Sequence, residues 1–355
     1  MSTPPSSLSP RGNAALTAVL RSALWPAAPA YAVLVAFAWI TVTLLFGPLA
    51  AGANAGTSLT WIVWWPVLPV VLFLGGRVWC AICPFGTVID LVQKVSGLGR
   101  PVPGWLKRWG VWIIDGLFIL ITFLDHTVGI VENPRGSGFL LAGIAVSALV
   151  MAVLFERRAW CRYVCFLGGL SGNYARAGLL QVRANTDACR TCETKACYRG
   201  RPADGALAAV PGCPMFEFPS AVQTSSYCNL CGNCVKACPS GALSVSARPP
   251  LVELLGLTRA RYPEAALATV IAGIVLVQNA TMLTAWPDWL AVLTRLAFGS
   301  EALAFSLAFV GFMGAPVALV AGSAWISNRL GGGSGTRDNF TRFAYALIPL
   351  DLAGH

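Results

Sequence analysis

The most informative stretch of this chain is Cys228-Asn-Leu-Cys231-Gly-Asn-Cys234-Val-Lys-Ala-Cys238-Pro239. Its spacing, C-x2-C-x2-C-x3-C-P, is typical of proteins that hold a [4Fe-4S] cluster, and the fourth cysteine of such a run ligates a second cluster. A structural zinc site needs four ligands and gains nothing from the trailing Cys-Pro. The stretch therefore predicts an iron–sulfur protein.

A second, less regular set of cysteines precedes this stretch, and its last member, Cys213, is also followed by proline. The swapped ligation of two-cluster proteins then predicts two sets of four ligands. The first cluster would be held by Cys189, Cys192, Cys197 and Cys238. The second cluster would be held by Cys228, Cys231, Cys234 and Cys213. Residues 198–212 would form an insertion between the third and fourth cysteines of the upstream set.

The composition indicates a membrane protein. The chain is 56% hydrophobic and only 11% charged, with a mean hydropathy of +0.67, which is unlike a soluble domain. Six apolar runs are long enough to cross a bilayer: 30–49, 59–74, 109–124, 139–155, 265–283 and 302–326. A seventh candidate, 340–355, would be about 24 Å long as a helix. That length is short of a hydrocarbon core of roughly 30 Å.

The positions of Lys and Arg predict the orientation, because cationic loops stay in the cytoplasm. With the N-terminus inside, only Arg135 and Arg295 of the 25 Lys and Arg residues lie outside. All twelve cysteines then face the cytoplasm, where thiols stay reduced. A signal peptide cleaved near Ala51-Gly-Ala53 is the alternative for the first span, but its apolar stretch and leading arm are too long. We expect a multi-pass inner (cytoplasmic) membrane protein with its N-terminus in the cytoplasm, and its net charge of +10 needs no nucleic-acid partner.

Two further cysteine pairs follow the second and fourth spans. We call Cys80, Cys83, Cys161 and Cys165 the membrane-proximal cysteines. Their surroundings resemble each other, which suggests the internal duplication of a helical hairpin. The two stretches are Arg77-Val-Trp-Cys-Ala-Ile-Cys-Pro-Phe-Gly86 and Arg157-Arg-Ala-Trp-Cys-Arg-Tyr-Val-Cys-Phe-Leu-Gly168.

The membrane-proximal cysteines admit three interpretations. They could form one four-thiolate site for a third iron–sulfur cluster. They could be redox-active dithiols, because the neighbouring Arg77, Arg157, Arg158 and Arg162 would lower thiol pKa values. They could also be packing or metal-trafficking residues, since free cysteine is often buried.

With these motifs, the chain resembles the NapH/NosR type of membrane ferredoxin-like proteins, related to the methylamine-utilisation protein MauN and the oxidase-assembly protein CcoG. The resemblance covers roughly residues 77–247. It implies hairpin spans that end in cytoplasmic Cys-x3-Cys-Pro motifs, followed by a ferredoxin-like segment with two [4Fe-4S] clusters. This chain departs from that pattern in three places. Only two residues separate Cys80 from Cys83, Phe166 replaces a proline, and an insertion precedes Cys213.

The expected fold is a mostly α polytopic membrane protein with six to seven transmembrane helices and an inserted cytoplasmic α+β domain like a bacterial ferredoxin. Four regions are predicted. They are a cytoplasmic arm at 1–29, a four-helix membrane region at 30–182, the domain with two [4Fe-4S] clusters at 183–247, and a membrane region of two to three helices at 248–355.

Three polar residues lie within or at the end of the third span: Asp115, Asp125 and His126. Oxidation of a quinol would need a proton acceptor there, and an Asp-His pair suits that role. The alternative is that they are interfacial residues facing water.

Enzymatic signatures such as a phosphate-binding loop or a nucleophile elbow are not found in the sequence, so the expected chemistry is electron transfer. The predicted function is a relay of electrons between the quinone pool in the lipid bilayer and a redox partner protein. Two alternatives remain. One is an assembly or maturation factor that supplies electrons for building another metalloenzyme, and the other is a redox-sensing membrane regulator.

Overall fold

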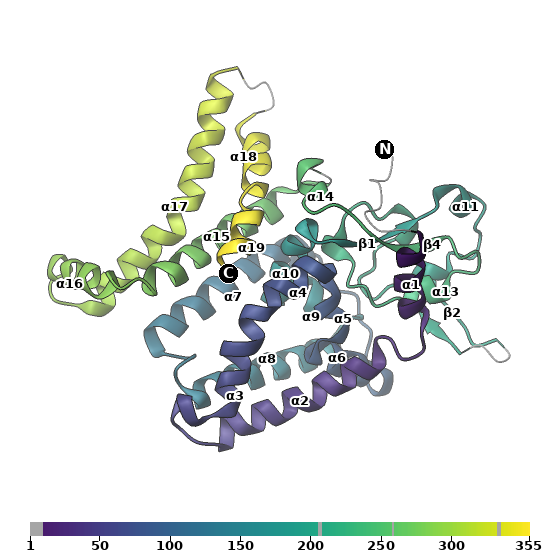
Figure 1. Cartoon of the computed structure of the whole chain (residues 1–355), viewed down its shortest axis with the longest axis horizontal. Helices are drawn as coiled ribbons and strands as arrows, with labels where there is room; N and C mark the ends of the chain where they lie inside the picture. The colour runs from purple at the N-terminus through teal and green to yellow at the C-terminus, as the bar shows by residue number, and fades with distance from the viewer. Residues whose placement is uncertain (1–9, 205–207, 258, 332–334) are drawn as a thin grey trace. The chain divides into compact units, whose positions relative to one another are not determined.

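The computed structural model describes residues 10–204, 208–257, 259–331 and 335–355 (Figure 1). The chain divides into two compact units. The first unit contains the chain up to Arg108 together with Val131–Arg259, and the second contains Trp109–Ile130 together with Ala260–His355. The cysteines all belong to the first unit.

Among the described residues, six helical segments are long and apolar enough to cross a membrane. They match the six apolar runs predicted from the sequence. The segments are α2 (Ala27–Phe46), the composite segment Ala55–Val95, α7 (Gly104–Val128), α8 (Pro134–Leu154), α15 (Tyr262–Thr281) and α17 (Glu301–Arg329).

The second span is a series of short helices rather than one straight helix. It comprises α3 (Ala55–Thr57), a π-helical turn (Ser58–Trp64), α4 (Trp65–Gly75), a 3-10 turn (Gly76–Val78), α5 (Trp79–Ile82) and α6 (Pro84–Val95). The break after α4 falls at Gly76, whose φ of +58° is a left-handed conformation that glycine adopts readily. Pro84 then starts α6 at the position where its missing N–H costs nothing. These breaks place Cys80 in the short helix α5 and Cys83 between α5 and α6.

The fourth span ends in the same way. Arg158, with a φ of +54°, follows α8 and precedes the short α9 (Ala159–Tyr163). Cys165 then caps α10 (Phe166–Ala177), which is buried along its whole length except at Gly169. Both stretches therefore run from a short helix through a cysteine into a second helix, as the predicted duplication requires.

The ferredoxin-like part of the first unit is built on a two-stranded sheet. Strand β1 (Leu180–Ala184) pairs antiparallel with β4 (Leu243–Ala247), so that Val182 lies opposite Val245. Between them lie α11 (Thr186–Arg190), α12 (Ala196–Arg199), the short pair β2 (Gly200–Arg201) and β3 (Val210–Pro211), 3-10 turns at Pro219–Ala221 and Ser225–Tyr227, and α13 (Asn233–Ala237). The short helix α14 (Val252–Leu255) follows β4.

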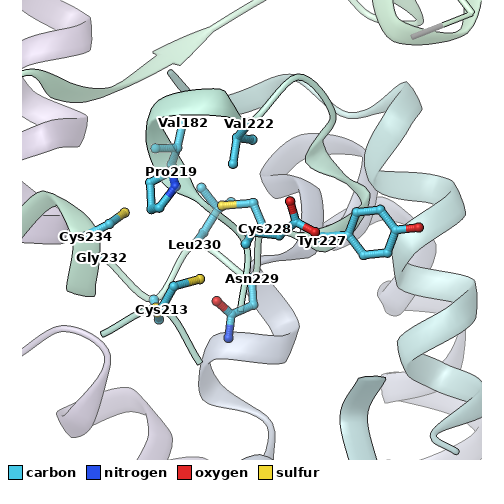
Figure 2. Close-up of a pocket in the computed structure, with 12 residues that line it drawn as sticks. Val182, Cys213, Pro219, Val222, Tyr227, Cys228, Asn229, Leu230, Gly232 and Cys234 are labelled. Carbon is cyan, nitrogen blue, oxygen red and sulfur yellow. The ribbon is translucent and has the colours of Figure 1, made fainter. Parts of the chain in front are cut away.

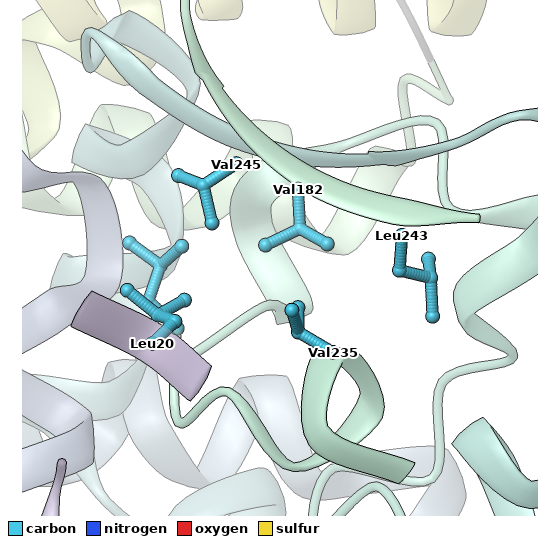
Figure 3. Packing of buried hydrophobic residues seen from close by; sticks show 6 residues of the cluster. Leu20, Val182, Val235, Leu243 and Val245 are labelled. Carbon is cyan, nitrogen blue, oxygen red and sulfur yellow. The ribbon is translucent and has the colours of Figure 1, made fainter. Parts of the chain in front are cut away.

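The segment expected to be an N-terminal arm is part of this core. Helix α1 (Pro10–Arg21) packs on β4 and α13, and its Leu20 joins the apolar cluster of Val182, Val235, Leu243 and Val245 (Figures 1 and 3). Thr17 Oγ1 accepts a hydrogen bond of 3.1 Å from Val245 N. The ferredoxin-like core thus includes α1, and the boundary expected at residue 183 falls inside β1.

The second unit contains α15, α16 (Trp286–Leu296), α17 and two short helices at the C-terminus. The candidate seventh span, 340–355, is not a single helix. It is divided between α18 (Thr336–Tyr345) and α19 (Ile348–Gly354), and both pack on α15. Because each is far shorter than a bilayer requires, the upper end of the predicted range, seven spans, does not hold for the described residues.

Candidate iron–sulfur sites

The turn around Cys228 is shaped by two residues in the left-handed region. Leu230 has a φ of +55° and Gly232 a φ of +79°. The curled backbone brings the amide N–H of Leu230 to the Cys228 thiol and that of Asn233 to the Cys231 thiol. Gly232 also approaches α1 closely, because a Cβ there would lie 2.5 Å from Leu20 O. The turn can therefore stabilise negative charge on its sulfurs.

Four thiols line one cavity next to this turn. They are Cys213, Cys228, Cys231 and Cys234. Figure 2 shows the sulfurs of Cys213, Cys228 and Cys234 directed into the same space, with Val182, Pro219 and Val222 on its apolar side. Burial, together with the neighbouring Cys213 thiol, raises the pKa of Cys228 to about 11 and that of Cys231 to about 12, although the backbone amides of Leu230 and Asn233 lower them in part.

A second group of thiols adjoins this cavity and is more exposed. Burial raises the pKa of Cys197, and the neighbouring Cys238, Cys189 and Cys192 raise it further. Cys192 is half-buried, and the Thr194 hydroxyl lowers its pKa. The Cys197 thiol also contributes to raising the pKa of Cys234 in the first group, so the two groups are neighbours.

The membrane-proximal cysteines form a third group, contributed by two hairpins. Burial raises the pKa of Cys165 well above its usual value, and Cys161, Cys83 and Cys80 raise it further. Burial also raises the pKa of Cys161, although Arg158 lowers it in part. The expectation that arginines would give low thiol pKa values is therefore wrong for Cys161 and Cys165, because burial outweighs the nearby positive charge.

Two buried arginines contact this third group. Arg77 and Arg158 are each only 4% exposed. Arg77 Nε lies 3.4 Å from Cys80 Sγ, and Arg77 Nη1 donates to Ser226 O. Arg158 forms a two-pronged ion pair with Asp90, with Nε–Oδ1 and Nη2–Oδ2 distances of 3.0 and 2.6 Å.

The chemistry of these donor sets fits iron–sulfur clusters. Four thiolates are the ligands that such clusters use. A buried thiolate without a cation is costly, whereas a coordinating thiol is deprotonated by the charge of its metal. Within the described parts of the chain, no three His, Cys, Asp or Glu side chains are arranged to hold a single metal ion. The predicted ligand sets coincide with the three neighbourhoods, and the assignment of ligands stays a prediction.

Known families match both cysteine-rich regions. A family described as "4Fe-4S binding domain" matches residues 57–108 and 137–183, which contain the membrane-proximal cysteines. A second family with the same description matches residues 222–244, which contain the run from Cys228 to Cys238.

Several curated proteins are similar to the chain. The putative electron transport protein YccM of Escherichia coli K12 is 26% identical over 205 residues, 51% of this chain and 54% of that protein. The methylamine utilization ferredoxin-type protein MauN of Paracoccus denitrificans is 30% identical over 169 residues, 44% of this chain and 56% of that protein. The match thus spans about half the length of these relatives. No solved structure matches the chain significantly.

The chain is thus similar, in its cysteine-rich regions, to 4Fe-4S ferredoxin-type proteins such as MauN. The regions that match 4Fe-4S binding domains support bound iron–sulfur clusters, and six of the described helical segments are long and apolar enough to cross a membrane.

One residue that holds the loop before Cys228 was missed by sequence reasoning. Glu253, on α14, is 3% exposed. It accepts hydrogen bonds from Ser225 N and Thr224 Oγ1 at 3.0 Å and pairs with Arg183 and Arg248. Burial raises the pKa of Glu253, but Arg248, the Ser225 amide and Arg183 together bring it below its usual value. Glu253 thereby holds the loop that leads to Cys228, and no sequence motif marks this contact.

The polar residues of the third span lie in the second unit and are not gathered at one point. Asp115 is 5% exposed, and neither of its carboxylate oxygens has a hydrogen-bond partner among the described residues. It precedes His126 by eleven positions, or about 16 Å along the helix. His126 hydrogen-bonds Thr122 O and Thr281 Oγ1, and its Nδ1 lies 3.9 Å from Asp125 Oδ2. Asp115 is therefore separate from the Asp125–His126 pair.

Proposed function

We propose that this protein relays electrons between the quinone pool and a redox partner protein. The proposal includes two [4Fe-4S] clusters in the ferredoxin-like domain and a third iron–sulfur site at the membrane-proximal cysteines. The observation that carries it is the occurrence of three four-thiol groups in one compact unit, each adjoining the next.

Each group would hold one cluster, and a bound iron–sulfur cluster supplies a one-electron carrier. Cys189, Cys192, Cys197 and Cys238 would hold the outermost one, because the residues on either side of Cys192 are exposed to solvent. Cys213, Cys228, Cys231 and Cys234 would hold the next one, with backbone amides close to its thiols. The membrane-proximal cysteines would hold the third. We call these the outer, middle and inner sites.

Contacts between groups support a continuous path. Cys197 of the outer site lies near Cys234 of the middle site. Arg77 and Arg158, which flank the inner site, lower the pKa of Cys228 and Cys231 respectively. The outer site, which exposed residues border, is therefore suited to a partner protein in solution, and the inner site belongs to the helices that are able to span the membrane.

The quinone side of the relay requires a proton acceptor. Oxidation of one quinol to a quinone releases two electrons and two protons, and the electrons would pass to the partner protein. Asp115 suits the proton-accepting role because it is a buried carboxylate without a hydrogen-bond partner among the described residues. The Asp125–His126 pair is a second candidate, although His126 already bonds two neighbours.

Metal analysis of the anaerobically purified chain tests the cluster content. We expect about twelve iron and twelve sulfide ions per chain if all three sites hold cubanes. Cys192→Ser, Cys231→Ser and Cys161→Ser should each remove a different electron paramagnetic resonance signal, so each variant serves as a control for the other two. Zinc in place of iron would contradict the assignment of iron–sulfur clusters. An unchanged iron content in Cys161→Ser would reject the inner site.

A stopped-flow assay with duroquinol tests the quinone link. The quinol should bleach the iron–sulfur absorbance of the purified chain in liposomes. Asp115→Asn should slow this reaction by about 100-fold or more, because a positioned base typically contributes that much. Asp288→Asn, which changes an exposed aspartate of the same unit, should leave the rate unchanged. Clusters that stay oxidised in the wild-type chain would contradict the quinone link and leave ferredoxin-type electron transport in place.

A further inference from the structure

The two copies of the duplicated hairpin place an arginine, two cysteines and a glycine at equivalent positions. In each copy an arginine stands three residues before the first cysteine, and a glycine stands three residues after the second. These residues are Arg77, Cys80, Cys83 and Gly86 in the first copy and Arg158, Cys161, Cys165 and Gly168 in the second.

Local contacts within each copy are also equivalent. Arg77 Nε lies 3.4 Å from Cys80 Sγ, and the Arg158 guanidinium likewise lies beside the Cys161 thiol. Gly168 N donates to Cys165 Sγ at 3.3 Å, and the Gly86 amide lies near the Cys83 thiol. Each copy therefore brings one cationic side chain and one backbone amide to its own pair of thiols.

Each arginine also packs against the glycine of the other copy. A Cβ at Gly168 would lie 3.2 Å from Arg77 Nη2, and a Cβ at Gly86 would overlap the Arg158 guanidinium. This exchange of side chains relates the two copies by an approximate two-fold operation around the four thiols. A duplicated hairpin whose two copies contact each other symmetrically would produce this arrangement.

The symmetry ends one turn further along the second helix of each copy. Four residues after Gly86 stands Asp90, and its carboxylate pairs with Arg158 of the other copy. Four residues after Gly168 stands Gly172. In place of a carboxylate, the carbonyl oxygen of Ser226 accepts from Arg77, and a Cβ at Gly172 would lie 3.2 Å from that oxygen.

We infer that Gly172 is the position at which the duplicated hairpin was opened to receive the loop before Cys228, and that Arg77 is the positioning residue that links the inner site to the middle site. The absent carboxylate leaves Arg77 a free donor for Ser226, two residues before Cys228. Asp90 keeps the equivalent donor of Arg158 within the hairpins. This inference rests on the proposed function for the identity of the two sites.

The symmetric carboxylate can be restored in the full-length chain. In Gly172→Asp, the new carboxylate should pair with Arg77 and displace the Ser226 carbonyl. The amides of residues 224–228 should then exchange with deuterium faster than in the wild type, and the midpoint potential of the middle site should fall, because a cation near a cluster stabilises its reduced, more negative form. The inner-site signal should persist.

Other variants distinguish loss of the Arg77–Ser226 contact from a general destabilisation of the fold. Arg77→Gln should accelerate exchange in the 224–228 loop and alter the signals of both sites, whereas Arg158→Gln and Asp90→Asn should leave that exchange unchanged. Gly143→Ala, which adds a Cβ to a span helix where nothing lies within 4 Å, controls for a helical glycine substitution. Arg100→Gln removes an exposed arginine and should match the wild type.

Two outcomes would overturn the inference. One is an unchanged exchange rate for residues 224–228 in both Gly172→Asp and Arg77→Gln. The other is an equal acceleration of exchange at residues 224–228 in Arg77→Gln and Arg158→Gln. Exchange is measured on the polypeptide itself, so it reports the Arg77–Ser226 link even if metal analysis shows that the inner site holds no iron.

Discussion

Gly232 occupies a position that no other residue can take without strain. Its φ is +79°, and its α-carbon faces the carbonyl oxygen of Leu20. A residue with a side chain pays about 1–2 kcal/mol for the left-handed conformation alone. The same glycine therefore shapes the turn that holds Cys228 and Cys231 and allows α1 to approach it.

Gly232→Ala should destabilise the middle site more than Gly241→Ala. Both glycines have positive φ, but a Cβ at Gly241 would meet only the flexible end of Arg21 at 3.3 Å. We expect Gly232→Ala to lower the midpoint of thermal iron–sulfur bleaching, with a smaller drop for Gly241→Ala. Equal drops in the two variants would show that the Leu20 contact adds nothing to the cost of the backbone conformation.

The Glu253 carboxylate makes the stability of the loop before Cys228 depend on pH. Its folded-state pKa lies below the usual value because Arg248, Ser225 N–H and Arg183 outweigh burial, which raises it. A depressed carboxylate pKa adds stability that is complete above the unfolded-state value of about 4.3 and is lost as pH falls below it. Release of iron should therefore accelerate below about pH 4.3, and this acceleration should be weaker in Glu253→Gln.

At pH 7, Glu253→Gln should cost about 3–5 kcal/mol, because it leaves the fully buried Arg248 without its counter-charge. Asp187→Asn is the matched control. It breaks an exposed pair with Arg190 at 3.8 Å, which should be worth less than about 1 kcal/mol. Chemical denaturation followed by iron–sulfur absorbance provides the comparison, and similar losses in both variants would argue against the role of Glu253.

Helix α1 joins the ferredoxin-like core although most of the membrane helices separate it from that core in the sequence. Its apolar residues cover the sheet, while Asn13 Oδ1 and Thr17 Oγ1 accept hydrogen bonds from the backbone of β4. These bonds satisfy N–H groups on a strand that would otherwise face solvent.

Leu20→Ala should therefore destabilise the cluster domain by about 2–5 kcal/mol, since Leu20 is 7% exposed and lies in the core. Val19→Ala on the same helix changes a residue that is 52% exposed and should cost little. The loss of acid-labile sulfide on heating measures both. A chain whose clusters survive equally in the two variants would show that α1 is dispensable.

The folded, packed state of helix α19 should be more stable at neutral than at alkaline pH. Burial raises the pKa of Asp351 to about 8, whereas an unfolded aspartate titrates near 3.9. A raised carboxylate pKa adds stability that is complete at low pH and is lost as pH rises to about 8. Proteolysis near the C-terminus should therefore be faster at pH 9 than at pH 6.5, and Asp351→Asn should remove this difference. Persistence of the difference in the variant would assign it to another group.

For the whole molecule, the distribution of Lys and Arg predicts which loops face the cytoplasm. A reporter that is active only in the cytoplasm should work when fused after Arg100, Ala247 or Arg337. It should be silent near Asn133 or Asp288. These positions lie on opposite sides of the predicted spans, so an active fusion at Asn133 would reverse the expected side of every cysteine.

The sequence by itself determined the features that depend on short-range spacing or on bulk hydropathy. The ligand run from Cys228 to Cys238 can be recognised in the sequence, because ligands that come from one short stretch of backbone have a characteristic spacing. The six spans are readable because the bilayer thickness sets a minimum apolar length. The candidate third group was also visible, because a basic residue, two cysteines and a glycine recur after the second and fourth spans.

Only the tertiary structure decided which distant residues meet. The packing of Leu20 on β4, the contact of Glu253 with Ser225, and the exchange of Arg77 and Arg158 between the hairpins join residues far apart in the chain. No local pattern specifies such contacts, because they arise from the way in which whole helices and strands pack. The candidate seventh span illustrates the same limit. Its apolar residues bury themselves against α15 as two short helices, and hydropathy alone does not distinguish protein from lipid as the apolar surroundings.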